Sequence, residues 1–157
     1  MKLKNLLTVL ETVRQLQQKG WEISEAAVHK GLAQVKKLTG LHGRWDIIHT
    51  HPLVVLDVAH NPHAALMLAD GLGDMGFFQN TLAVFSMLRD KDARGVVDAV
   101  KHRVDAWYVG RIDSARGANV NWLATQITEL APSAPIQKFT SVGAAYQSAW
   151  EAAEQND

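Results

Sequence analysis

The polar residues that follow the apolar run Leu-Val-Val-Leu at 53–56 are the first candidates for chemistry in this chain. Asp57, His60 and Asn61 come directly before a stretch with the apolar spacing of a helix. A carboxylate at a strand end can accept hydrogen bonds from a ligand hydroxyl, such as that of a ribose, or from a loop amide. His60 alone is more often structural, and Asn61 suits a helix N-cap. The combination Asp-x-x-His-Asn-Pro is more specific than its members, and it indicates a site.

Several familiar kinds of site are disfavoured by the sequence. His49, His51, His60 and His63 lie close together but lack the H-E-x-x-H spacing of a zinc hydrolase, so no metal site is predicted. There is no G-x-x-x-x-G-K-[ST] loop for a triphosphate, no G-x-G-x-x-G after a strand and no G-x-S-x-G nucleophile elbow. Two interpretations follow: the chain binds some other ligand, or it is one piece of a larger enzyme.

The composition is that of an ordinary globular protein. Of 157 residues, 47% are hydrophobic and 20% are charged, and the 16 basic residues balance the 16 acidic ones. The balance gives no reason to expect a nucleic-acid or membrane-surface partner. Cysteine is absent, which excludes disulfides and thiolate sites and fits a reducing, cytoplasmic location. We see no secretory leader and no apolar run long enough to span a bilayer.

The first third of the chain predicts two helices. Leu3, Leu6, Leu10, Val13 and Leu16 follow helical spacing over residues 3–18, and Gly20 ends that helix. A second helix begins after Ser24 as N-cap and ends at Gly40, with an inner face formed by Val28, Leu32 and Val35.

From residue 45 onward the pattern changes to strands alternating with helices. Strands are predicted over 45–49, 53–58, 82–86, 106–109 and 136–139, and helices over 62–73, 92–103, 120–130 and from 142 onward. The apolar run at 53–58 predicts a strand covered on both faces, and Leu66, Ala69 and Leu72 are expected to face inward. Such alternation favours an α/β fold, Rossmann-like, with a mainly parallel sheet and flanking helices. In such sheets ligands bind beyond the carboxyl ends of the strands, where Asp57 is expected.

Four blocks of this sequence resemble a known family. They are "GRW" at 43–45, "LDVAHNPHAA" at 56–65, "SMLRDKDARG" at 86–95 and "SARGA" at 114–118. In content and order they resemble the carboxy-terminal third of folylpolyglutamate synthase/dihydrofolate synthase, a branch of the Mur ligase superfamily. The resemblance implies that residues 1–42 are the helical end of the central ATPase domain and that 43–157 are the carboxy-terminal α/β domain, without its final strand.

The resemblance implies an ATP-dependent ligase. Enzymes of this family use ATP and Mg2+ to convert a carboxylate of folate or dihydropteroate to an acyl phosphate, which the amino group of L-glutamate then attacks. The family's P-loop and most of its Mg2+ ligands lie upstream of the blocks matched here. The amino-terminal ATPase domain of the same polypeptide is therefore an expected partner, and the chain alone is expected to be inactive.

Individual residues take expected roles from the same resemblance. Arg44 matches an arginine that meets the nucleotide phosphates, Asp57 an aspartate that holds the ribose, and His60 a histidine beside the nucleotide. Asn5 resembles a nucleotide-contacting asparagine at the end of the central domain. All four are therefore expected to bind ATP.

Two further residues are expected to bind glutamate. Lys91 resembles the lysine that pairs with the carboxylate of the incoming amino acid, and Arg116 is an anion-site candidate in the "SARGA" block. A surface salt bridge for Arg44 and a solvated turn for Lys91 remain alternatives. So do a stand-alone binding domain without catalysis and the equivalent domain of another Mur-type amide ligase.

Overall fold

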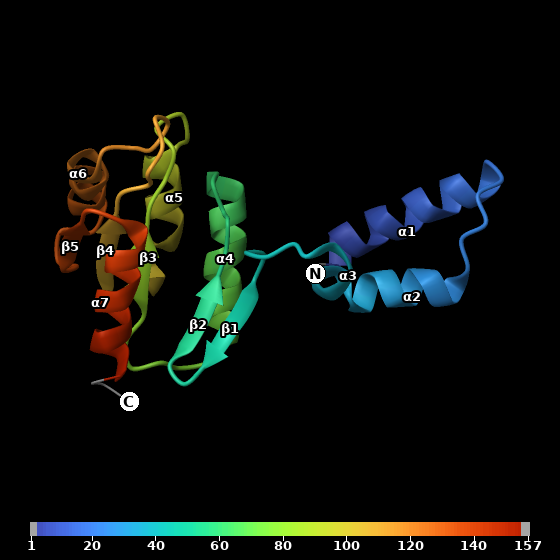
Figure 1. Ribbon diagram of the computed structural model, residues 1–157, viewed down its shortest axis with the longest axis horizontal. Coiled ribbons are helices and arrows are strands. Elements are labelled where there is room, and N and C mark those ends of the chain that lie inside the picture. Colours follow the sequence, from blue (N-terminus) through green and yellow to red (C-terminus); the bar gives the residue numbers. More distant parts are fainter. Residues whose placement is uncertain (1–2, 155–157) are drawn as a thin grey trace. The chain divides into compact units, whose positions relative to one another are not determined.

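The computed structural model describes residues 3–154, with side chains described from 6 to 153. It divides into two compact units, residues 1–42 and 43–157, which are treated separately below. Figure 1 shows the elements of both units. Within the described residues, every helix is too short or too polar to cross a membrane.

The first unit contains helices α1 (Leu3–Gln18), α2 (Glu25–Ala33) and α3 (Val35–Thr39). The Ser24 hydroxyl accepts a hydrogen bond from the Ala27 amide, which confirms the predicted N-cap. The prediction of one helix up to Gly40 is wrong, because Gln34 leaves the helical conformation with φ −125° and splits it into α2 and α3. Neither α2 nor α3 contains a buried residue, and short helices depend on tertiary packing to stay continuous.

The second unit contains the remaining elements. In chain order they are β1 (Asp46–Thr50), β2 (Leu53–Leu56), α4 (Pro62–Asp74), β3 (Leu82–Phe85), α5 (Ala93–Val100), the 3-10 helix η1 (Lys101–Arg103), β4 (Ala106–Gly110), α6 (Val120–Leu130), β5 (Ile136–Phe139) and α7 (Val142–Glu154). The helix starts follow local capping chemistry. Asn61, Asp92, Asn119 and Ser141 each accept a hydrogen bond from a backbone amide two or three residues further on.

Strands β3, β4 and β5 form a parallel sheet in that order, which confirms the α/β class. Side chains alternate across β4, so Trp107 and Val109 face one side and Tyr108 faces the other. On the first side they join a core from α4, α5 and α6 that includes Val97, Leu123 and Ile127. On the second side Tyr108 packs with Ala145 and Ala149 of α7. Figure 1 shows α7 lying beside β3 and β4.

The prediction that residues 53–58 form a buried strand of the parallel sheet is wrong. Strand β2 ends at Leu56 and pairs antiparallel with β1 in a separate two-stranded sheet. Leu56 and Val58 are 40% and 52% exposed. Only His51 and Pro52 separate the two strands, and a two-residue connection joins antiparallel neighbours, whereas parallel neighbours need a long crossover.

The inner face of α4 also differs from the prediction. Ala65 and Ala69 are buried, while Leu66 is 50% exposed. The helix packs closely against α5, because Gly95 of α5 lies where an added Cβ would come within 2.5 Å of the Pro62 ring. This close approach brings the first turns of α4 and α5 together, and with them the loops that precede these helices.

Candidate functional site

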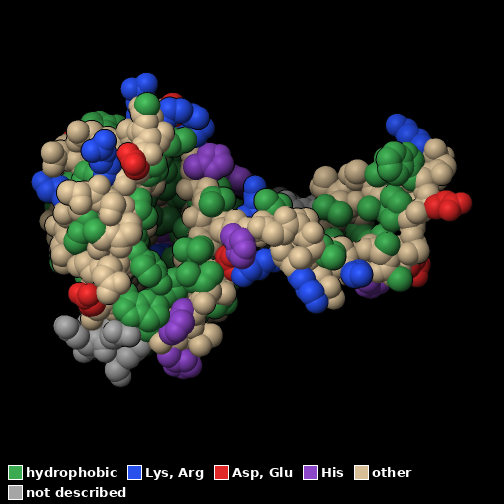
Figure 2. Space-filling view, in the orientation of Figure 1, with side chains coloured by type: hydrophobic (Ala, Val, Ile, Leu, Met, Phe, Trp, Pro, Cys, Tyr) green, Lys and Arg blue, Asp and Glu red, His purple; other side chains and the backbone are tan. Residues whose placement is uncertain are grey.

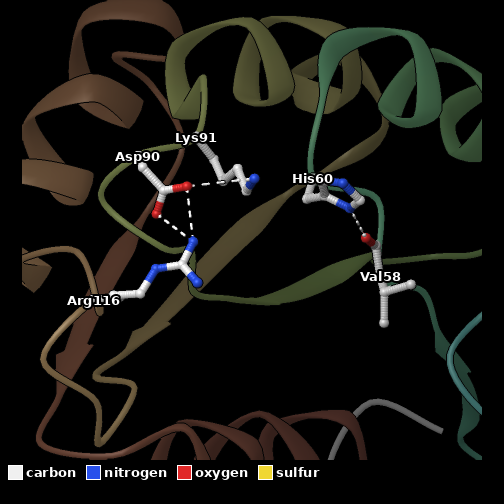
Figure 3. Close-up of polar contacts among 5 residues, drawn as sticks. All are labelled: Val58, His60, Asp90, Lys91 and Arg116. Carbon is white, nitrogen blue, oxygen red and sulfur yellow. Dashed lines mark hydrogen bonds and ion pairs between the residues drawn. The ribbon is translucent and has the colours of Figure 1, made fainter.

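The loop between β2 and α4 carries His60 and Asn61. The ring atom Nδ1 of His60 lies 2.9 Å from the Val58 carbonyl oxygen (Figure 3). A carbonyl oxygen only accepts hydrogen bonds, so Nδ1 carries a proton and donates. In the neutral ring this leaves Nε2 as an acceptor for a ligand. Asn61 caps α4 through the Ala64 amide at 2.9 Å, so its side chain is engaged in structure.

Asp57 uses both carboxylate oxygens to organise backbone. Oδ2 accepts a hydrogen bond from the Trp45 amide at 2.8 Å, and Oδ1 accepts one from the Ala59 amide at 2.8 Å. The carboxylate therefore ties the segment before β1 to the loop after β2. Each oxygen of an ionised carboxylate has two lone pairs, so the exposed Asp57 can still accept a hydrogen bond from a ligand hydroxyl.

Arg44 lies in the segment that Asp57 holds. The carbonyl oxygen of Gly43 accepts a hydrogen bond from the Val58 amide at 2.7 Å, so both neighbours of Arg44 are attached to the loop after β2. Arg44 itself is exposed, and within the described part of the chain its guanidinium has no hydrogen-bond or ion-pair partner. It is thus a free cation beside Asp57.

Lys91 and Arg116 meet at Asp90, in two loops beyond the carboxyl ends of β3 and β4. Nη2 of Arg116 lies 2.9 Å from each carboxylate oxygen of Asp90, and Nζ of Lys91 lies 3.4 Å from Oδ2 (Figure 3). The hydrogen bond from Arg116, helped by Lys91, lowers the pKa of Asp90 below its usual value. The result is a cluster of two cations around one anion.

Backbone contacts fix the two loops of this cluster to each other. The Arg89 amide donates to the Arg116 carbonyl at 2.8 Å, and the Ala118 amide donates to the Met87 carbonyl at 2.9 Å. The β4–α6 loop also lines a groove of about 470 Å³, whose lining residues include Arg111, Ser114, Asn121 and Thr140.

Three loops therefore converge at one edge of the second unit. The β2–α4 loop brings His60, the β3–α5 loop brings Asp90 and Lys91, and the β4–α6 loop brings Arg116. In Figure 3 the Lys91 side chain extends from Asp90 toward His60. Figure 2 shows basic side chains over these loops and histidine side chains beside them at the start of α4. The arrangement suits an anionic ligand that needs several donors at once.

The sequence interpretation missed the part played by Asp90. Two acids flank Lys91, and that pattern was the available signal: Asp92 caps α5 through the Gly95 amide, whereas Asp90 pairs with both cations. The side chain of Asn5 lies outside the described residues. Among the residues described, no group of three or more His, Cys, Asp and Glu side chains is arranged to hold a metal ion.

Comparison with known proteins gives one family and a consistent set of relatives. The model of the family described as Mur ligase, glutamate ligase domain, matches residues 43–157. The dihydrofolate synthase/folylpolyglutamate synthase of Escherichia coli (strain K12) is 36% identical over 153 residues, covering 98% of this chain and 33% of that protein. This chain therefore spans about a third of that relative's length.

Solved structures agree with this result. The structure of E. coli FolC in complex with DHPP and ADP matches with a TM-score of 0.80 and 33% identity, over 96% of this chain and 33% of that one. A bifunctional folylpolyglutamate synthase/dihydrofolate synthase with Mn, AMPPNP and L-glutamate bound matches with a TM-score of 0.69 and 34% identity, over 87% of this chain and 31% of that one.

Proposed function

The chain belongs to the Mur ligase glutamate ligase domain family, and we propose that it is the carboxy-terminal portion of an ATP-dependent ligase that adds L-glutamate to folate or dihydropteroate in the cytoplasm. The proposed reaction is supported by the relatives named dihydrofolate synthase/folylpolyglutamate synthase. The E. coli relative is about three times as long as this chain. Structures of such proteins with DHPP and ADP, or with AMPPNP and L-glutamate, support the substrate classes.

The convergence of three loops at the carboxyl edge is the observation that carries the proposal. It gathers Lys91 and Arg116, with His60 on the neighbouring loop, at the edge where open α/β sheets bind ligands. L-Glutamate brings two carboxylates, and a guanidinium and an ammonium are the side chains that pair with them. Lys91 and Arg116 therefore hold the incoming amino acid, and Asp90 draws both cations to its carboxylate before that ligand arrives.

The residues of the β1–β2 side serve the nucleotide. ATP supplies the phosphoryl group that activates the carboxylate, and charge develops on that group as it is transferred. The guanidinium of Arg44 is unpaired among the described residues and permanently charged, and it stabilises the charge on the transferred phosphoryl group. Asp57 accepts from a ribose hydroxyl with its remaining lone pairs, and His60 offers Nε2 beside the nucleotide. The proposed ATP-binding role of Asn5 rests on the family resemblance.

Residues 1–42 form the helical end of the ATPase domain in this proposal. They separate from residues 43–157 as a compact unit, and α2 and α3 bury none of their residues. Leu7, Trp21 and Leu38 are 57%, 63% and 51% exposed. Apolar surface of that extent is expected to pack against the upstream domain of the same polypeptide, which also supplies the P-loop and the Mg2+ ligands.

The test compares the intact polypeptide that ends in this chain with the 157-residue chain alone. ADP release that requires both L-glutamate and dihydropteroate or a folate is expected from the intact polypeptide only. Within it, Lys91→Ala and Arg116→Ala should raise KM for glutamate more than KM for ATP, whereas Arg44→Ala should lower kcat. The proposal would be refuted if the intact polypeptide turned over ATP without L-glutamate and without dihydropteroate or a folate. It would also be refuted if the 157-residue chain ligated glutamate by itself.

A further inference from the structure

We propose that Trp45 and Gly71 are positioning residues for Arg44: the indole of Trp45, seated against Gly71 of α4, fixes the direction in which Arg44 leaves its loop. The inference rests on the proposed role of Arg44 toward the nucleotide phosphates. It extends the site to a helix residue that has no side chain.

The contact depends on the absence of a side chain at residue 71. A Cβ added to Gly71 would lie 2.6 Å from two carbons of the Trp45 ring, Cη2 and Cζ3, and 3.2 Å from Cε3. Carbon atoms do not approach so closely, and a flat, rigid ring cannot bend away as the end of a long side chain can. Only glycine therefore lets the indole lie on this face of α4.

The backbone on both sides of Arg44 is held in an uncommon conformation. Trp45 has φ +50°, and it is the one non-glycine residue with positive φ among those described; Gly43 has φ +78°. A bulky residue remains in the left-handed region only where its surroundings impose it. Here the surroundings are the ring contact with Gly71 and the hydrogen bond from the Trp45 amide to Asp57.

Hydrogen bonds also hold Gly43, the residue on the other side of Arg44. Its carbonyl accepts from the Val58 amide at 2.7 Å, and its amide approaches the buried Asp46 carboxylate at 3.4 Å. The Cα of Arg44 thus lies between two fixed neighbours, while its guanidinium is exposed. Such an arrangement fixes the Cα of Arg44 and the direction of its Cα–Cβ bond, while the guanidinium stays available for a ligand. An error of about 1 Å in the placement of a group that contacts the substrate can lower a rate about 100-fold.

The two glycines of α4 provide a matched pair of substitutions. Gly71→Ala introduces the methyl group into the indole contact. Gly73→Ala gives the same helix the same gain in helix propensity, but the three atoms nearest its Cβ all belong to the end of the Arg103 side chain, which can move. In the intact ligase, Gly71→Ala should lower kcat about tenfold or more with KM for glutamate little changed, and Gly73→Ala should leave kcat within about twofold.

A double-mutant cycle tests whether the effect passes through Arg44. In an Arg44→Ala background, Gly71→Ala should cost no more than about twofold further. Trp45→Leu, which removes the indole from this face of α4, should itself lower kcat, and adding Gly71→Ala to it should cost little further. An equal loss from Gly71→Ala in both backgrounds would show that it acts on the fold alone and would overturn the inference.

A second readout needs no catalysis and separates this inference from the proposed function. Trypsin cleaves after Arg44, and the rate of cleavage reports how often the loop opens. In the 157-residue chain, cleavage at Arg44 should be faster in Gly71→Ala than in wild type or Gly73→Ala, with cleavage at Arg111 unchanged. Equal rates at Arg44 in all three chains would overturn the Trp45–Gly71 contact as a positioning device, whatever the activity of the intact ligase. A ligase without activity would instead refute the proposed function.

Discussion

Arg116 directs one guanidinium nitrogen, Nη2, to both carboxylate oxygens of Asp90, at 2.9 Å from each. The two residues come from different loops and are 26 positions apart in the chain. Lys91 approaches the same carboxylate at 3.4 Å. The anion thus sets the spacing of two cations that we propose to receive the carboxylates of L-glutamate, and it holds the β3–α5 and β4–α6 loops together.

This ion pair predicts a pH dependence. Because Arg116 lowers the pKa of Asp90 below its usual 3.8, the pair stabilises the fold at pH values above 3.8, and that contribution is lost as the pH falls through the lower pKa of the folded state. A carboxyl titration followed by NMR should give a midpoint below 3.8 for Asp90. Arg116→Gln should move the midpoint toward 3.8; an unchanged midpoint would contradict the assigned cause.

Arg44 is predicted to matter for rate and little for folding. The side chain is exposed and unpaired among the described residues, so Arg44→Ala should change the unfolding free energy of the 157-residue chain by no more than about 0.5 kcal/mol. In the intact ligase the same change should lower kcat/KM by about 100-fold or more, and Arg44→Lys should recover only part of the loss. Melting of the chain and kinetics of the ligase check the two halves. A strongly destabilised chain with normal kinetics would make Arg44 a structural residue.

Asp57 is predicted to affect both folding and nucleotide binding. Its carboxylate accepts from the Trp45 and Ala59 amides, so Asp57→Ala should lower the stability of the chain by roughly 1–3 kcal/mol. The same variant of the intact ligase should show a raised KM for ATP. Asp57→Asn keeps one acceptor oxygen and should lose less stability. Lost stability with an unaltered KM for ATP would assign Asp57 to the loop alone.

The core on one face of the sheet gives a prediction about stability only. Leu123 of α6 is 0% exposed, whereas the adjacent Trp122 is 43% exposed. Leu123→Ala should cost about 2–5 kcal/mol through lost burial and the cavity left behind. Trp122→Ala should cost clearly less, although it removes a larger side chain. Chemical denaturation of the two variants measures both values, and equal losses would mean that α6 packs on another face.

Interactions within a few residues could be predicted from the sequence alone. Residue type and position predict Ser24 and Asn61 as N-caps, and the structure confirms both. The alternation of strands and helices after residue 80 also predicts the parallel sheet. Apolar periodicity is a local signal, since it reflects a single element and the face that this element buries. The motif blocks predicted the family, which the match over residues 43–157 confirms.

The tertiary structure decided what couples elements that are distant in the chain. The apolar run at 53–56 is compatible with a buried parallel strand or with one arm of a hairpin, and only its partner, β1, settles the matter. Asp57 had two possible roles by sequence, and its hydrogen bond to Trp45 depends on a segment 12 positions away. The Asp90–Arg116 pair and the contact of Trp45 with Gly71 join different elements in the same way. Their geometry depends on how sheet and helices pack, and the types and spacing of nearby residues do not determine that packing.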